Sequence, residues 1–114
     1  MAVTETQALS HPEPAEFKLA AVLHALSDPV RLRIVAALAA GREQTCKSFE
    51  LPVTKSTCTH HLRVLREAGV IRQRVEATTK LNSLRRPELE ERFPGLLDAV
   101  LRGVPAGLHP VEHV

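Results

Sequence analysis

The sequence has very few aromatic residues: it contains three phenylalanines and neither tryptophan nor tyrosine. It also has only two cysteines, Cys46 and Cys58, too few for the disulfide framework of a small secreted domain. No apolar run approaches the roughly 20 residues of a membrane-spanning helix, and the first residues lack a signal-peptide pattern. We therefore expect a cytoplasmic protein in a reducing compartment, with no membrane partner.

The chain does have the composition of one small folded domain. Its 114 residues suffice for a single core, and 44% of them are hydrophobic and 25% charged, which argues against a disordered chain. Because aromatic residues are scarce, the core has to be built from leucine, valine, isoleucine and alanine. A core that is both small and aliphatic is marginal on its own, so the composition favours a homodimer.

The charge of the chain is unevenly distributed, although its net value is only +2. Residues 54–86 carry eight basic and two acidic side chains, a net charge of +6, whereas the segments on either side are net acidic. A cationic block confined to one part of a chain is typical of a surface that binds phosphate. A solvated basic face without a partner would have the same composition, so the order of the elements has to decide between them.

Apolar periodicity and capping residues predict a mainly α-helical domain with a small two-stranded β-hairpin. Asp28 is expected to cap a helix that Pro29 opens. The expected helices span roughly residues 15–26, 30–40, 45–50, 54–68, 87–92 and 94–102. The expected organisation is a flexible arm, one domain and a mobile tail, over residues 1–14, 15–103 and 104–114.

The helix expected after Thr54 has two different faces. Cys58, Leu62 and Leu65 recur at the spacing of an inward apolar stripe. A second stripe at helical spacing is entirely polar and consists of Ser56, Thr59, His60 and Arg63. A helix with such a face can lie in the major groove of DNA and present hydrogen-bonding groups to base edges. An amphipathic surface helix without a ligand would show the same two stripes.

Two strand-like runs, 70–76 and 79–84, follow this helix and are joined by a polar connection at 77–78. Arg72 and Arg74 alternate with uncharged residues, so one face of the hairpin is expected to be charged. A helix, a short helix, a polar-striped helix and a basic hairpin, in that order, make a winged helix-turn-helix. This order favours a DNA-binding surface over a solvated basic face.

Two segments carry specific motifs: ALSDPVRLRI at Ala25–Ile34 and STCTHHLRVLREAGVI at Ser56–Ile71. Together they resemble the ArsR/SmtB family of bacterial winged helix-turn-helix transcriptional regulators, and the resemblance covers about residues 15–103. It implies a homodimer that pairs through its first and last helices, binds a palindromic operator and represses transcription, often in response to a metal. The dimer interface implied for this chain consists of Leu19, Val22, Leu23, Leu97, Val100 and Leu101.

The chain departs from this family in its metal-binding residues. A closely spaced cysteine pair is common on the third helix of the family, but Cys46 has Ser48 two residues away. Cys46 is expected to be more exposed than Cys58 and is a candidate redox or metal group. Alone it provides too few ligands for a soft metal, and a cysteine shared across a dimer is the alternative. The last helix offers Asp98 and no histidine. The remaining candidates for binding Ni or Zn are His11, His109, Glu112 and His113, and a histidine-bearing tail without metal is the alternative.

The candidate DNA contacts are polar residues of the helix and cations of the hairpin: Lys55, Ser56, Thr57, Thr59, His60, Arg63, Arg72, Arg74 and Lys80. Arg63 is the strongest candidate for reading guanine, because a guanidinium donates to two acceptors on the base edge. Of His60 and His61, one is expected to face the groove and the other the core, since adjacent helical positions point about 100° apart. For Thr57, capping or packing on the one hand and DNA contact on the other are equal alternatives.

The sequence predicts a DNA-binding transcriptional regulator, with double-stranded DNA and a second copy of the chain as partners. A metal effector and a partner protein are further candidates. No glycine-rich phosphate loop or Ser/His/Asp set indicates an enzyme. One alternative is a winged helix that acts as a protein-interaction module, although the candidate surface lacks the aromatic anchors that protein interfaces prefer. A small metal-handling protein is the third alternative.

Overall fold

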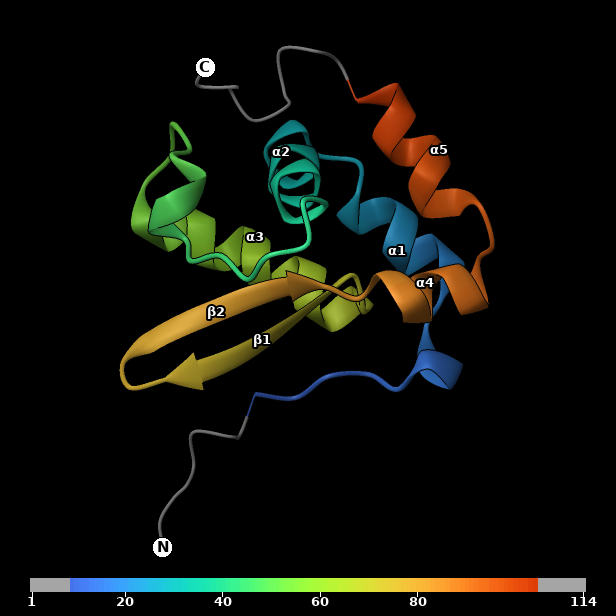
Figure 1. The fold of residues 1–114 in the computed structure, drawn as a ribbon, viewed down its shortest axis with the longest axis horizontal. Helices are drawn as coiled ribbons and strands as arrows, with labels where there is room; N and C mark the ends of the chain where they lie inside the picture. Colours follow the sequence, from blue (N-terminus) through green and yellow to red (C-terminus); the bar gives the residue numbers. More distant parts are fainter. Residues whose placement is uncertain (1–8, 105–114) are drawn as a thin grey trace, which may run out of the picture.

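The protein is a winged helix-turn-helix, as the order of its elements predicts (Figure 1). The computed structural model describes residues 9–104. The helices in this range are α1 (Leu19–Ala25), α2 (Pro29–Leu38), α3 (Lys55–Ala68), α4 (Arg86–Arg92) and α5 (Leu96–Gly103). The strands and 3-10 turns are β1 (Ile71–Glu76), β2 (Thr79–Leu84), η2 (Pro14–Glu16) and η3 (Lys47–Phe49). None of these helices is long and apolar enough to cross a membrane.

Helices α2 and α3 begin at the caps that the sequence predicts. The carboxylate of Asp28 accepts hydrogen bonds from two backbone N–H groups at the start of α2, at 2.7 and 3.1 Å. The hydroxyl of Thr54 accepts from the backbone N–H of Thr57 at 3.2 Å. These bonds satisfy donors that have no partner inside the helix. Gly69 ends α3 in the left-handed conformation, with φ of 93°.

The core lies where the inner face of α3 meets α1 and α2. Cys58, Leu62 and Leu65 are each at most 3% exposed, which confirms the predicted inward stripe. Phe17 packs against Gly69 at the end of α3, so closely that a Cβ added there would overlap with the ring and lie 2.6 Å from its Cδ1 atom. Each fully buried leucine contributes about 1.5–3 kcal/mol. The same packing directs the polar face of α3 outward.

Two helices are shorter than predicted. The first is divided, because Lys18 is extended between η2 and α1 and thereby allows Phe17 to turn into the core. The segment predicted as a short helix over 45–50 forms only the single turn η3. Glu50 ends that turn in the left-handed conformation, with φ of 52°. Neither break has a periodic signal, because each depends on the backbone conformation of a single residue, Lys18 or Glu50.

Residues 9–14, which belong to the expected flexible arm, lie along β1 (Figure 1). The backbone N–H of Gln73 donates to Nε2 of His11 at 3.0 Å, and the guanidinium of Arg85 donates to the carbonyl of Pro12 at 2.8 Å. Burial and the neighbouring charge of Arg72 lower the pKa of His11, which favours the neutral ring that accepts this bond. This part of the chain is therefore attached to the hairpin.

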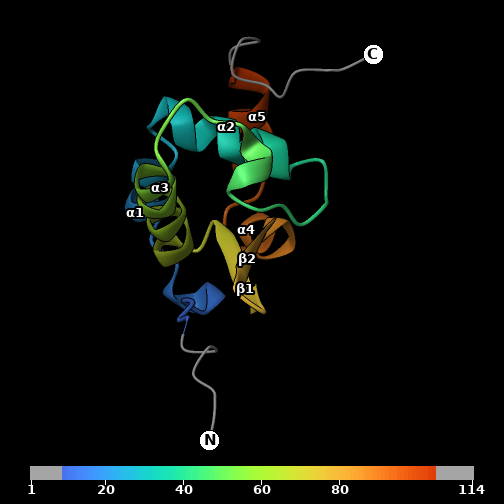
Figure 2. The ribbon, with the colours of Figure 1, turned by 90° about the vertical axis from the view of Figure 1, so that its left-hand side faces the viewer.

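The two strands pair antiparallel in the register Ile71↔Leu84 to Glu76↔Thr79. We call β1, β2 and the turn between them the wing. Ala77, in the turn, has a φ of 58°, and Thr78 is not in the positive-φ region. A type I′ turn needs positive φ at both central residues, so this turn is of another type. The wing lies beside α3 (Figure 2).

A chain of hydrogen-bonded polar side chains connects α3 to the wing and continues to α2. Arg66 donates to the Gln73 amide oxygen at 2.7 Å, and Gln73 donates to the Asn82 side chain at 2.8 Å. Asn82 donates to the carbonyl of Gln44 at 3.0 Å, and the Gln44 amide donates to the carbonyl of Ala37 at 2.8 Å. Asn82 is fully buried. Because the buried amides are hydrogen-bonded, the chain fixes the wing relative to α3.

A buried arginine holds the middle of α3 against α1. Arg31 donates to the carbonyls of Ala25 at 2.7 Å and His24 at 3.3 Å. Its third contact is with Nδ1 of His61, at 3.0 Å. Because a guanidinium only donates, this nitrogen accepts and the neutral ring carries its proton on Nε2. Burial, assisted by the charge of Arg31 and opposed by Asp28, lowers the pKa of His61.

Replacing Gly69 with alanine is expected to destabilise the protein by about 3 kcal/mol, because backbone strain and overlap with Phe17 act together. Gly41 is the matched control, since it also has positive φ but no atom lies within 4 Å of an added Cβ. Gly41→Ala is expected to cost about 1 kcal/mol through strain alone. Urea unfolding measures both free energies. Equal losses in the two variants would contradict the close packing of Phe17.

The free energy of unfolding is expected to fall as the pH drops below about 6.5. The folded state keeps His61 neutral, whereas the unfolded chain takes up a proton near the ordinary pKa of 6.5. His61→Asn is therefore expected to reduce the difference between urea midpoints at pH about 7.5 and about 5.5. An unchanged difference in His61→Asn would exclude this origin of the pH dependence.

Candidate nucleic-acid interface

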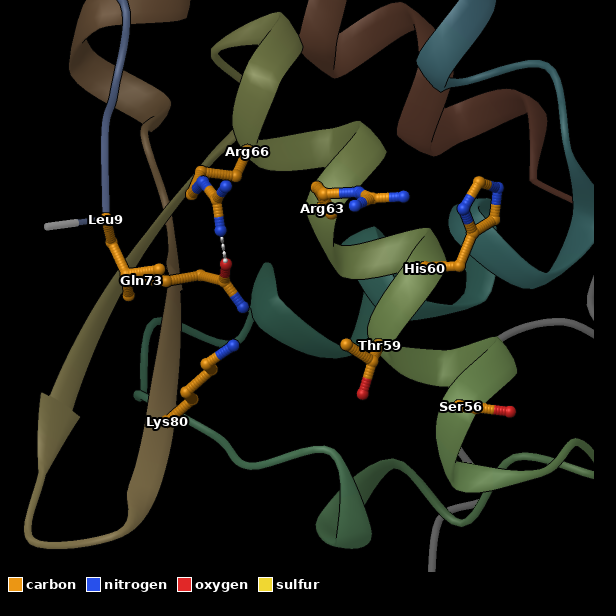
Figure 3. Close-up of a pocket in the computed structure, with 8 residues that line it drawn as sticks. All are labelled: Leu9, Ser56, Thr59, His60, Arg63, Arg66, Gln73 and Lys80. Atoms are coloured by element: carbon orange, nitrogen blue, oxygen red, sulfur yellow. Dashed lines mark hydrogen bonds between the residues drawn. The ribbon is translucent and has the colours of Figure 1, made fainter.

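The cleft between α3 and the wing has a volume of about 300 Å³ (Figure 3). It is open to solvent along the exposed face of α3. Most of its lining side chains are polar or cationic, and together they are Leu9, Ser56, Thr59, His60, Arg63, Arg66, Gln73 and Lys80. We call this surface the α3–wing cleft.

The polar stripe predicted on α3 lines one side of this cleft. Its four members are exposed and lie on successive turns (Figure 3): Ser56, Thr59, His60 and Arg63. Their position follows from helical geometry, because burial of the apolar stripe leaves the opposite face in solvent. His61 is buried and His60 exposed, so the two histidines divide between core and surface as predicted.

The pleat of the wing separates its basic residues. Lys80 pairs with Val75 and therefore lies on the same face as Gln73, from which both side chains point toward α3 (Figure 3). Arg72 and Arg74 alternate with Gln73 and lie on the other face. Of the three wing cations predicted to contact DNA, only Lys80 lines the α3–wing cleft.

Arg72 and Arg74 are held by carboxylates on that other face. Arg74 donates two hydrogen bonds to Glu43, at 2.7 and 2.8 Å, and Arg72 lies 3.2 Å from Glu88. The hydrogen bonds from Arg74 lower the pKa of Glu43, and the same bonds raise the pKa of Arg74. These pairs compensate part of the charge of the basic segment without any external partner.

The other arginines of the basic segment are also paired, except on the cleft side. Arg85 is buried, lies over the Phe17 ring and donates to Glu88, which lowers the pKa of that carboxyl. Arg86 pairs with Asp98 at 3.2 Å. Within residues 9–104, the exposed cations of this segment that form no ion pair are Lys55, Arg63 and Lys80. The uncompensated charge therefore lies on α3 and on the inner face of the wing.

The first turn of α3 contains two further predicted contacts with different environments. Thr57 accepts a hydrogen bond from the Thr54 hydroxyl at 3.0 Å and donates its backbone N–H to the same oxygen. Thr57 thus takes part in the cap of α3, and its exposed side chain stays a predicted DNA contact. Lys55 is exposed but lines a separate pocket beside Cys46 and Cys58.

The sequence interpretation missed Arg66 and Gln73 as lining residues. Arg66 lies one turn beyond Arg63, so the same stripe continued by one turn would have included it. Its Nε atom is buried and has no hydrogen-bond partner, although its Nη1 atom bonds to Gln73. Gln73 is uncharged and lies between two arginines, so the charge pattern of the strand indicated the opposite face as the functional one.

A bond between the two cysteines was not predicted from the sequence. Cys46 and Cys58 form a disulfide, with their Cα atoms 6.5 Å apart. Cys58 is buried, as its position in the apolar stripe predicts, and Cys46 is half-buried. The two residues are 12 positions apart, and only the path of the chain through η3 and Pro52 brings them together.

The metal candidates receive no support from the part of the chain that the structure describes. Residues 9–104 contain no group of three or more His, Cys, Asp or Glu side chains placed to hold a metal ion. Nε2 of His11 already accepts the hydrogen bond from Gln73. His109, Glu112 and His113 lie outside the described residues.

The residues expected at a dimer interface differ in exposure. Val22 and Leu97 are 1% and 3% exposed, so they belong to the core of the single chain and not to its surface. Leu19 and Leu23, at 48% and 46%, are the exposed large hydrophobic residues of α1. Val100 and Leu101 on α5 are partly buried. The prediction of six surface residues is thus corrected for Val22 and Leu97.

Comparison with known proteins agrees with this geometry. The sequence model of a family described as "Helix-turn-helix domain" matches residues 26–74, which include α2, α3 and most of β1. The chain is 34% identical over 84 residues to the uncharacterized HTH-type transcriptional regulator YceK of Bacillus subtilis. That alignment covers 71% of this chain and 84% of the relative.

A second relative is an uncharacterized HTH-type transcriptional regulator of Methanocaldococcus jannaschii. It is 40% identical over 63 residues, which cover 54% of this chain and 71% of the relative. The segment that the family model matches contains the capped α2, the polar-faced α3 and the start of the wing. On this evidence, the chain belongs to the family of helix-turn-helix transcriptional regulators.

Proposed function

We propose that the protein is a sequence-specific transcriptional repressor of the ArsR/SmtB type that binds a palindromic operator as a homodimer in the cytoplasm. The observation that carries this proposal is the α3–wing cleft, where unpaired cations and small polar side chains line one open surface. Relatives described as HTH-type regulators support the same conclusion.

In this proposal the lining residues divide into two roles. Lys55 and Lys80 neutralise phosphates, because an ammonium is a point charge without base specificity. Ser56, Thr59 and His60 offer short hydrogen-bonding groups to base edges along the exposed face of α3. Arg63 reads guanine through the two donors of its guanidinium. The chain thus positions α3 electrostatically and reads sequence with the centre of that helix.

The proposed homodimer uses the exposed apolar residues of α1. Leu19 and Leu23 lie near half exposure on one helix face. Val100 and Leu101 extend an apolar stripe on α5. Two copies paired through these helices would present two α3 helices to half-sites one helical turn apart. We place the DNA-binding and dimerisation unit over residues 15–103, with residues 9–14 attached to its wing.

A metal effector belongs to the proposal only through His109, Glu112 and His113. Imidazole and carboxylate groups suit Ni or Zn. A true effector has to change operator affinity, because binding free energies at coupled sites are reciprocal. Titrating the DNA complex with either metal therefore decides whether these residues sense it.

Arg63→Ala is expected to weaken binding to the preferred operator by about 1–3 kcal/mol and to relax the base preference at one position. The operator is the sequence that the wild-type protein selects from a random DNA library, and competition with unrelated DNA measures the preference. Arg102→Ala is the control, since this exposed arginine of α5 does not line the cleft. Selection of no sequence at all would remove the specific-regulator proposal and favour a protein partner.

Lys80→Ala is expected to lower affinity for all DNA sequences and to reduce the slope of log Kobs against log salt by about 1. Arg74→Ala is the matched control on the same wing, because its charge faces away from α3 and is paired with Glu43. Its slope is expected to stay within about 0.3 of the wild type. A larger change for Arg74 than for Lys80 would reverse the assignment of the two wing faces.

A further inference from the structure

The disulfide lies beside the proposed DNA-binding face and ties the beginning of α3 to the segment before it. Cys58 is the fourth residue of α3, and its neighbour Thr59 lines the α3–wing cleft. Cys46 immediately precedes η3. The bridge therefore closes the loop that contains the Thr54 cap and Lys55, both at the helix end closest to the candidate contacts.

The surroundings of the two sulfur atoms suit a reactive pair. Both cysteines line a pocket of about 320 Å³ with Lys47, Lys55 and Glu50. This lining carries two ammonium groups and one carboxylate, and such net positive, partly exposed surroundings are typical of reactive cysteines. Cys46 is half-buried and open to small molecules, whereas Cys58 is 2% exposed. This difference assigns the first attack to Cys46 and the second to Cys58.

We propose that Cys46 and Cys58 form a reversible redox site, oxidised by hydroperoxides, that regulates the DNA-binding face. The regulatory part of this inference depends on the proposed function. A DNA-binding regulator works in the compartment that holds the DNA, where thiols are kept reduced. Disulfides that do form in such compartments are usually transient or redox-sensing. A permanent structural bridge would be unusual there, and a reversible one is expected.

The oxidation proceeds in two balanced steps. The Cys46 thiolate attacks one oxygen of the peroxide, the O–O bond breaks, and the leaving hydroxide or alkoxide takes up a proton. Cys46 is then a sulfenic acid. The Cys58 sulfur attacks the Cys46 sulfur, the S–S bond forms, and the S–O bond breaks to release water with the Cys58 proton. Two thiols lose two electrons in total, and hydrogen peroxide is reduced to two molecules of water.

The bridge is expected to strengthen DNA binding. In the oxidised protein the bridge holds the start of α3 in place with its polar face exposed. The conformational entropy of this segment is therefore already lost before DNA binds. In the reduced protein the loop between the cysteines has more freedom, which docking has to remove. We expect the oxidised protein to bind its operator about three- to tenfold more tightly than the reduced protein.

The redox chemistry is tested on the full chain without DNA. After treatment with hydrogen peroxide and denaturation, alkylation followed by mass spectrometry counts the free thiols. The reduced protein is expected to take two labels and the oxidised protein none, as a monomer on a non-reducing gel. Excess reduced glutathione is expected to restore both labels. Labelling after oxidation, a disulfide between two chains, or a bridge that glutathione cannot reduce would each overturn the proposal.

The regulation is tested by fluorescence anisotropy with the selected operator and with unrelated DNA. Cys46→Ser is the main variant, since Cys46 lies outside the α3–wing cleft, and its affinity is expected to equal that of the reduced protein under all conditions. Cys58→Ala is the second variant. It also lacks the bridge, so it is expected to give the same affinity and keeps the test valid if Cys46→Ser does not fold. Equal operator affinity of the oxidised and reduced wild type would overturn the regulation. Failure of either form to prefer the operator would instead refute the proposed function, while thiol counting still decides the redox site.

Discussion

The burial of one helix face determines where the functional surface lies. Cys58, Leu62 and Leu65 pack against α1 and α2, and this packing fixes the rotation of α3 about its own axis. Rotating α3 by one residue would turn each stripe by about 100° and would expose apolar atoms while burying charge. The polar face of α3 is therefore held in solvent by the aliphatic core and not by contacts of its own.

Ion pairing within the chain decides which cations are available to a partner. The net charge of the basic segment suggests a wing that is cationic on its whole surface, but Glu43 and Glu88 engage the arginines of one face. Such exposed pairs contribute little to stability. Their main effect is on the distribution of potential, because they leave Lys80 as the wing cation that faces α3. The positive field of the wing is thereby concentrated on one side.

The sequence was sufficient where a structural feature depends on local chemistry. The caps Asp28 and Thr54, the stop at Gly69 and both strands follow from residue type and periodicity. Features that depend on distant segments were not predictable. Two such features are the hydrogen bond between His11 and β1 and the disulfide between Cys46 and Cys58. Each joins segments whose relative position cannot be inferred from the periodicity of the sequence. The faces of the wing were predicted, but which one turns toward α3 depends on tertiary packing.

The series of hydrogen bonds through Arg66, Gln73 and Asn82 limits how the protein can adapt to a duplex. Separating α3 from the wing would break the bond between Arg66 and Gln73 and leave the buried amide oxygen of Gln73 without this donor, at a cost of about 1–3 kcal/mol. Mismatch in groove width therefore has to be absorbed by the nucleic acid. Duplexes with flexible pyrimidine–purine steps deform at lower cost than stiff A-tracts. Base pairs that touch no side chain would then still influence affinity through the mechanics of the double helix.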